Sequence, residues 1–291
     1  MSSQILDIRF VNRNKTAFEL DVLTLQQLFQ RRLSHSLEAP QRVHFNIAML
    51  FTKGEGTHVI DFQKYACKKQ TLLFVAENQV QQFQVNPELD AFLILFTRSF
   101  FYPRQEDQRI LQNFRILDAS LQSPSIDLSD FDYERFLFFF QEIAHEYRQQ
   151  PATPFQPVIL SNLLRIILMQ AEQLKQTEFS PNALAAYLEF SRFKDQVEKD
   201  LDRTHNVKDY AHKLGTSTKL LNQWTQTVVN KPAKTFVDDR VILEIKRLLT
   251  HTNLPIKTIA EQTGFDEPTN LIKFFRQRTH QTPATFRNQS R

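Results

Sequence analysis

The chain has 291 residues, of which 41% are hydrophobic and 23% are charged, the composition of a globular protein with room for one to three domains. Only 4 glycines are present, and neither GxGxxG nor GxxxxGKS/T occurs, which excludes the glycine-rich phosphate-binding loops. The single cysteine, Cys67, excludes an internal disulfide and a cysteine-cluster metal site, and we expect it to be a small buried residue in a reducing compartment.

Charge is unevenly distributed along the chain. Residues 190–291 carry 18 Lys and Arg against 11 Asp and Glu, a net charge of +7, whereas residues 1–189 have a net charge of −3. A basic C-terminal third indicates that a polyanion binds there. The first residues, MSSQILDIRFVNRNK, have no apolar run after a basic start, and no stretch of 18 apolar residues occurs. We therefore expect a soluble cytoplasmic protein with no signal peptide and no membrane partner.

Residues 41–102 have the pattern of a β-rich domain. Segments rich in Val, Ile, Phe and Thr recur about every 8 to 12 residues and are separated by turn signals such as KGEG and NPEL. The expected strands are VHFNIAMLF, THVIDFQ, TLLFVAE, VQQFQV and DAFLILFTRSF. This spacing predicts a sandwich or a barrel. TKGEG is expected to form a hairpin tip, because its two glycines can adopt positive φ.

Beyond Pro103 the hydrophobic spacing becomes helical. YERFLFFFQEIAHEYRQ is expected to form a helix, PATPFQP interrupts the chain, and a second helix is expected over residues 155–175. The apolar stripe of this second helix is wider than one packing partner needs, so it packs either on its own domain alone or partly against a second subunit. The candidate dimerisation residues are Leu160, Leu163, Leu164, Ile167 and Leu168. KQTEFSPNAL then resembles a linker, which we place at residues 179–189.

The stretch NLPIKTIAEQTGFDEPTNLIKFFRQRT predicts two helices joined by a tight turn. Gly264 is expected to end the first helix in the left-handed conformation, and Asp266 can cap the second, at about residues 267–278. Apolar residues at i, i+3 and i+4 hold the second helix to the core, so its polar and basic residues face elsewhere, as a DNA recognition helix requires. The outward-facing candidates for DNA contact are Thr269, Asn270, Ile272, Lys273 and Arg276.

An earlier stretch, NVKDYAHKLGTSTKLLNQWTQTVVN, repeats this plan. Gly215 and Thr216 form the expected turn, and Ser217 is the expected N-cap of a helix over residues 217–228 whose buried face is Leu221, Trp224 and Val228. The outward-facing candidates are Lys219, Asn222, Gln223 and Gln226. An amphipathic helix, FVDDRVILEIKRLLTHT, joins the two units. Lys231, Arg240 and Arg287 are candidates for phosphate contact or for structural pairing.

Residues 190–289 resemble the DNA-binding domain of the AraC/XylS family of bacterial transcription regulators. The resemblance is carried by IKTIAEQTGFDEPTNLIKFFRQRTHQTPATFR and, more loosely, by VKDYAHKLGTSTKLLNQWTQTV with FVDDRVILEIKRLL. It implies an all-α domain over residues 190–291, with helix-turn-helix units at about 207–228 and 256–278. Asn230 and His280 stand where the family has Gly, so we expect weaker but intact left-handed caps. Gln223 stands where a basic residue is common, so the first unit is expected to read bases differently or to bind less tightly.

Residues 40–175 resemble, more faintly, the cupin-type barrel with helices that senses an effector and dimerises in that family. The resemblance implies a first domain, residues 1–178, with candidate ligand-binding residues in its barrel. These candidates are Lys53, Gln82, Phe83, Ala91 and Leu93. They are less polar than a sugar requires. They are compatible with an apolar or aromatic carboxylate held by Lys53. They are also compatible with a filled barrel that is regulated by a protein partner or not regulated at all.

Two other classes of function stay open at this point. A metal-dependent cupin enzyme needs a cluster such as His-x-His with a nearby Glu, but the barrel region offers only His44, Glu55 and His58 without such a pair, and we expect both histidines to lie on strand edges. A protein-binding adaptor built of helical repeats is the second class, and the outward-facing Lys219 and Lys273 count against it.

The sequence therefore predicts an α+β protein, a cupin-like β-barrel with dimerisation helices followed by an all-α domain with two helix-turn-helix motifs. The predicted function is that of a sequence-specific, effector-responsive transcription regulator, not an enzyme, that uses no metal and no cofactor. Its expected partners are double-stranded DNA, a second copy of the chain, a small apolar or carboxylate effector, and RNA polymerase if it is an activator.

Overall fold

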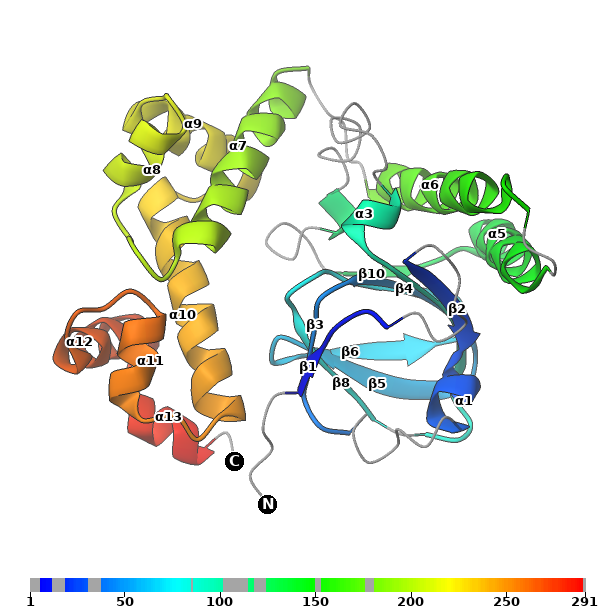
Figure 1. Ribbon diagram of the computed structural model, residues 1–291, viewed down its shortest axis with the longest axis horizontal. Helices are drawn as coiled ribbons and strands as arrows, with labels where there is room; N and C mark the ends of the chain where they lie inside the picture. The colour runs from blue at the N-terminus through cyan, green and yellow to red at the C-terminus, as the bar shows by residue number, and fades with distance from the viewer. Residues whose placement is uncertain are drawn as a thin grey trace. The chain divides into compact units, whose positions relative to one another are not determined.

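The structure, a computed structural model, describes residues 6–11, 19–30, 38–84, 86–101, 115–117, 124–149, 153–175 and 181–289. The chain divides into two compact units, and the boundary between them falls between residues 177 and 178 (Figure 1). The first unit contains β-sheets and helices, and the second is helical, so the fold class is mixed α+β. The predicted linker at 179–189 is helical from Pro181 onward, because helix α7 spans Pro181–Asp200.

The strands of the first unit form two five-stranded sheets, not one closed barrel. The first sheet has the order β1-β3-β8-β5-β6, and the second has the order β10-β7-β4-β9-β2. All strand pairs are antiparallel except β1 with β3. The strands are β1 Leu6–Ile8, β2 Leu20–Thr24, β3 Gln41–Val43, β4 Asn46–Lys53, β5 Glu55–Ile60, β6 Gln63–Lys68, β7 Thr71–Val75, β8 Val80–Phe83, β9 Asp90–Phe96 and β10 Ser125–Asp127.

Gly54 marks a corner between the two sheets. The prediction of a hairpin tip at TKGEG was wrong, because β4 belongs to the second sheet and β5 to the first. Gly54 adopts φ +76°, and a Cβ there would lie 2.4 Å from the carbonyl oxygen of Glu88. Both its backbone conformation and the close approach of Glu88 therefore require glycine. The hairpin in this region lies one strand later, where Asp61 and Phe62 both have positive φ between β5 and β6.

The second sheet is buried on both faces, which explains the nearly continuous apolar run of β4. Because successive side chains of a strand point to opposite faces, Ala48 and Leu50 lie on one side, and Ile47, Met49 and Phe51 on the other. The first side belongs to a cluster shared with helices, and the second to a cluster between the two sheets. The first unit thus has two cores that share one sheet as their common wall.

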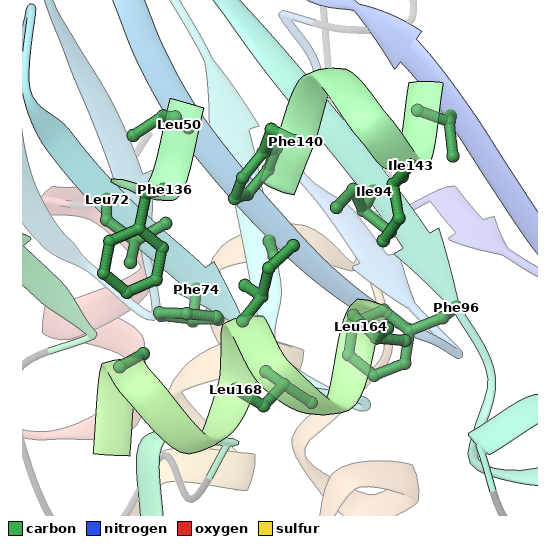
Figure 2. Close-up of a cluster of buried hydrophobic side chains, with 14 of the residues drawn as sticks. Leu50, Leu72, Phe74, Ile94, Phe96, Phe136, Phe140, Ile143, Leu164 and Leu168 are labelled. Atoms are coloured by element: carbon green, nitrogen blue, oxygen red, sulfur yellow. The ribbon is translucent and has the colours of Figure 1, made fainter. Parts of the chain in front are cut away.

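Helices α5 (Asp130–Arg148) and α6 (Gln156–Lys175) cover the outer face of the second sheet (Figure 1). Figure 2 shows Phe140 of α5 and Leu164 and Leu168 of α6 together with side chains of the sheet in this core. Ser129 begins α5 by accepting a hydrogen bond from the backbone N–H of Asp132 at 3.1 Å. Three short helical turns, α1 Leu25–Leu28, α3 Arg98–Phe101 and the 3₁₀ turn η2 Arg115–Leu117, complete the described part of this unit.

The predicted dimerisation residues lie inside this core. Leu160, Leu164, Ile167 and Leu168 are fully buried against α5 and the sheet, and Leu163 packs against the same cluster. Four of the five predicted residues are therefore used by the domain's own core, and Leu163 is half-buried. The helix was predicted correctly, but the buried part of its apolar stripe packs against α5 and the second sheet of the same domain.

The second unit consists of seven helices among its described residues 181–289. They are α7, α8 Val207–Lys213, α9 Thr218–Val229, α10 Ala233–His251, α11 Ile256–Gln262, α12 Pro268–Thr279 and α13 Pro283–Gln289. Aromatic side chains of α7, α8 and α10 meet in its core, where Phe193 contacts Tyr210 and Phe236 at ring-centroid distances of 5.7 Å each. In the described ranges of the whole chain, no helix is both long and apolar enough to cross a bilayer.

Candidate nucleic-acid interface

Helices α8 and α9 form a helix pair with capped ends. Asn206 begins α8 by accepting a hydrogen bond from the backbone N–H of Lys208 at 3.1 Å. Gly215, with φ +63°, turns the chain, and Ser217 begins α9 by accepting from the backbone N–H of Leu220 at 3.2 Å. One face of α9 holds it in place, since Leu221 and Thr225 are completely buried.

Helices α11 and α12 repeat this arrangement. Gly264, with φ +75°, lies in the turn between them, and Pro268 occupies the first turn of α12. The buried residues Leu271 and Phe275 hold α12 on its inner face. The expected cap at Asp266 was wrong by one residue: Glu267 occupies the cap position, and its side chain makes no capping hydrogen bond.

The two second helices end in the same left-handed conformation. Asn230 has φ 52° after α9, and His280 has φ 60° after α12. The expected left-handed caps are therefore present, and their lower stability stays a prediction. Asn and His are among the residues that tolerate this conformation best after glycine.

The predicted contact residues of α9 are all exposed, but two of them are already engaged. Asn222 donates from Nδ2 to the carbonyl oxygen of Thr218 at 2.9 Å and accepts at Oδ1 from the backbone N–H of Ala233 at 2.9 Å. Gln226 donates to Oδ1 of Asn230 at 2.6 Å. Among the described residues, the side chains of Lys219 and Gln223 make no hydrogen bond or ion pair, whereas Asn222 and Gln226 support the fold.

The outer face of α12 brings together five predicted residues. All are exposed, and Ile272, an apolar side chain, is 37% exposed. The five are Thr269, Asn270, Ile272, Lys273 and Arg276. Positions 269, 272, 273 and 276 follow the three- and four-residue spacing of a single helix face. This face is therefore polar and basic with one apolar contact point.

The three candidates for phosphate contact all have partners within the domain. Lys231 forms an ion pair with Asp239 at 2.6 Å, and Arg240 pairs with Glu198 at 2.6 Å. Arg287 donates to the carbonyl oxygen of Leu254 at 2.7 Å. Arg240 and Arg287 are half-buried, so these geometries favour their structural role.

Sequence reasoning missed the residues that connect the two helix pairs. His205, Asp238 and Arg278 join elements that are far apart in the chain. Asp238 is 1% exposed on α10, but no motif in the sequence indicates that these three residues contact distant segments.

The candidate ligand-binding residues of the first unit are not brought together. Phe83, Ala91 and Leu93 are buried in the cluster between the sheets, but Lys53 is exposed at the end of β4. The side chain of Gln82 donates to the carbonyl oxygen of Glu38 at 2.7 Å, and its strand neighbours Gln81 and Phe83 are the ones that point into the interior. The expected carboxylate pocket around Lys53 is therefore absent from this arrangement of the described residues.

His58 is buried, so the prediction that it lies on a strand edge was wrong. It is 2% exposed, its Nε2 lies 3.1 Å from Oε1 of Gln81, and its ring contacts Phe83 at 4.6 Å between centroids. Burial lowers the pKa of His58 to about 4, so the ring is neutral near pH 7. His44, in contrast, pairs with Asp7 near the surface at 3.1 Å. Among the residues described by the structure, no group of His, Cys, Asp and Glu side chains is arranged to hold a metal ion.

Comparison with known proteins favours the DNA-binding interpretation of the helical unit over the protein-binding one. Residues 210–289 match the family model of a helix-turn-helix domain. The chain carries the helix-turn-helix domain of a DNA-binding transcription regulator. The matched range begins at Tyr210 in α8 and ends with α13, so it contains both helix pairs.

Two curated proteins and a solved structure are similar to this chain. It is 24% identical over 246 residues to an uncharacterized HTH-type transcriptional regulator, YfiF, of Bacillus subtilis, which covers 81% of this chain and 74% of that protein. It is 21% identical over 261 residues to the HTH-type transcriptional activator RhaS of Escherichia coli, covering 85% and 87%. A solved structure of ToxT from Vibrio cholerae is 12% identical, with a TM-score of 0.43, and covers 94% of this chain and 98% of that one.

Proposed function

We propose that the regulator reads double-stranded DNA with α9 and α12, each placed in one of two successive major grooves. The observation that carries this proposal is the repetition of one arrangement. In each helix pair the second helix is fixed by fully buried residues on one face and exposes polar side chains on the other. A short helix can present base-reading groups only when its own position is fixed in this way.

The exposed side chains suggest how the two helices divide the reading. On α9, Gln223 is suited to adenine, which an amide can contact with two hydrogen bonds. On α12, Lys273 is suited to the acceptors of guanine, and the apolar Ile272 to the methyl group of thymine. Arg276 lies one turn further along α12 and is suited to a phosphate. Asn222 and Gln226, with their amides engaged, support α9 instead of reading bases.

The first unit is proposed to regulate this binding as a homodimerisation and sensing domain. Since the predicted contact residues are buried, a second copy must use the outward face of α6. Val158, Ile159 and Met169 of that face, and Phe155 immediately before the helix, are 41–72% exposed. We infer a largely apolar effector, because the interior between the sheets is lined by the apolar cluster together with the neutral His58 and Gln81. If the regulator is an activator, it also contacts RNA polymerase.

The test of the DNA-reading proposal is selection from a random library. The full-length protein is incubated with duplex DNA carrying a randomised central region, and bound duplexes are enriched at two salt concentrations in the presence of competitor DNA. We expect a two-part motif, one part for each reading helix, with affinity that falls steeply as salt rises. Binding that is wholly salt-dependent and enriches no motif would contradict the proposal and favour the protein-binding adaptor.

A further inference from the structure

The loop that connects α7 to α8 lies directly on the turn between α11 and α12. Nε2 of His205 in this loop lies 2.8 Å from the carbonyl oxygen of Thr263 and 3.2 Å from that of Leu201. Both partners are acceptors, so Nε2 must carry the proton and donate it. The ring also packs against Phe265, with centroids 4.8 Å apart, and against Phe274 at 6.4 Å. His205, in the loop that leads into the first helix pair, thus contacts the second pair.

Gly264 shows how close this contact is. A Cβ at this position would lie 2.9 Å from the carbonyl oxygen of Leu201, 3.1 Å from the carbonyl carbon of Asp202 and 3.1 Å from Nε2 of His205. Backbone atoms of the α7–α8 loop therefore occupy the space beside the glycine. Its positive φ serves the turn of the second pair, and its missing side chain admits the loop of the first.

A second connection runs through a buried carboxylate on α10. Asp238 is 1% exposed and pairs with Lys234 at 2.6 Å through Oδ1 and with Arg278 of α12 through Oδ2. Lys234 also donates to the carbonyl oxygen of His205 at 3.3 Å. A carboxylate this buried is stable in its charged form only when partners surround it. Asp238 therefore ties α12 to α10 and, through Lys234, to the α7–α8 loop.

A single connecting helix does not fix two domains as firmly as two separate connections do. Helix α10 joins the two helix pairs covalently, but the chain leaves it at residues 252–255, where the backbone is not helical. The contacts of His205, Gly264, Asp238 and Arg278 form a second connection at a different place. We name these four residues the inter-pair clasp, because they join the two helix pairs.

We propose that the inter-pair clasp fixes the position of α12 relative to α9, so that the regulator distinguishes operators by the spacing between their two half-sites. The four residues are positioning residues, since they hold the reading helices without being placed to touch DNA. The proposal rests on the DNA-reading function proposed above. It adds that spacing is recognised by the protein's own rigidity, in addition to the bases read by each helix.

Changing the spacing by one base pair is a demanding test of rigidity. One added pair shifts a half-site by about 3.4 Å along the axis and rotates it by about 35°, because a turn contains about 10 to 10.5 base pairs. A rigid pair of helices can no longer enter both grooves without distortion of the DNA. A pair joined only through α10 can follow the half-site.

The experiment measures the spacing penalty, defined as the ratio of the dissociation constants for the selected duplex with and without one inserted base pair. We expect a penalty of at least about tenfold for the full-length wild type. Arg278→Ala and His205→Ala are expected to reduce it to about threefold or less, with a smaller loss of affinity for the original spacing. The control is Arg192→Ala, which removes the exposed Arg192–Glu189 pair on α7 and leaves the clasp intact.

A second measurement needs no DNA and keeps the test independent of any loss of stability. Nitroxide labels are attached at the exposed positions Thr227 of α9 and Gln277 of α12. Pulsed electron–electron double resonance then reports the distance between the two reading helices. We expect a narrow distance distribution in the wild type and a broader one in Arg278→Ala, while circular dichroism confirms that both are folded.

The possible failures are distinguishable. A wild type that enriches no DNA motif overturns the DNA-reading function, and with it the role of the clasp. A wild type that binds its motif, with clasp variants that are folded and keep both the wild-type spacing penalty and the narrow distance distribution, overturns the clasp alone.

Discussion

Asn222, on the exposed side of α9, accepts a hydrogen bond from the backbone N–H of Ala233, the first residue of α10. The cap position of α10 is occupied by Pro232, which offers no side-chain acceptor. Asn222 therefore supplies from another helix the cap that α10 lacks in its own sequence. A residue that the sequence indicates as a base reader is thus committed to connecting the first reading helix to the helix behind it.

We expect Asn222→Ala to lower the free energy of unfolding of the C-terminal unit by about 1 kcal/mol, the usual effect of losing a helix cap. Asn222→Asp keeps an acceptor oxygen and should retain most of the stability. Urea denaturation followed by circular dichroism measures both. If the two variants unfold like the wild type but Asn222→Ala alone loses sequence preference, Asn222 is a base reader after all.

Lys273→Ala is expected to weaken binding to the selected operator by about 1–3 kcal/mol and to relax the preference at one base position. Lys273 is exposed on α12 and forms no ion pair among the described residues, so its removal leaves the fold unchanged. Fluorescence anisotropy with the operator and with single-base variants measures both effects. Lys64→Ala, an exposed lysine on β6 of the first unit, is the matched control. A uniform loss over all operator variants would assign Lys273 to a phosphate instead.

The buried His58 predicts acid sensitivity of the first unit. Its pKa is about 4 in the folded chain against 6.5 for the ordinary side chain, because burial disfavours the charged ring. Between these values the unfolded chain binds the proton and the folded chain does not, so stability falls as pH decreases from about 6.5 to 4. The pKa difference corresponds to about 3 kcal/mol at the lower limit.

Thermal unfolding between pH 7.5 and 4.5 checks this prediction. His58→Gln cannot titrate, and Gln can still exchange a hydrogen bond with Gln81, so its unfolding should depend less on pH in this range. An equally steep decline in His58→Gln would show that other groups cause the acid sensitivity.

Two substitutions on α6 separate its buried face from its exposed face. Val158→Glu, at a position 58% exposed, should leave the unfolding temperature nearly unchanged but shift the mass measured by sedimentation from dimer to monomer. Leu164→Ala, at a fully buried position, should lower the free energy of unfolding by about 2–5 kcal/mol through the cavity it leaves. A wild type that is monomeric at all concentrations would refute the proposed dimer.

The helical unit could be predicted well from the sequence because its signals are local. Gly215 and Gly264 mark the two turns, and the spacing of Leu271 and Phe275 fixes which face of α12 is buried. Contacts between distant segments were not predictable in this way. Nothing in the sequence around His205 or Asp238 indicates that they meet the second helix pair, since such contacts depend on how the helices fold back on one another.

The first unit was predicted less well for two physical reasons. Strand β6 was missed because QKYACK is an edge strand whose lysines face solvent, a composition that protects edges but hides strand periodicity. The stripe on α6 was assigned in part to a partner because the sequence gives the width of an apolar face but not the size of the surface beneath it. Likewise, Lys53 has a plausible residue type, but its exposed position at a strand end keeps it out of the interior.

The sheet shared by the two cores of the first unit has a mechanical consequence. Along β4, Leu50 supports the helices while the adjacent Phe51 fills the space between the sheets. Any molecule that enters between the sheets must displace side chains such as Phe51, and the strand that carries them is also the floor on which α5 and α6 rest. A close-packed wall of this kind does not deform locally. We therefore expect a change of packing between the sheets to strain the core beneath α5 and α6 through the backbone of β4.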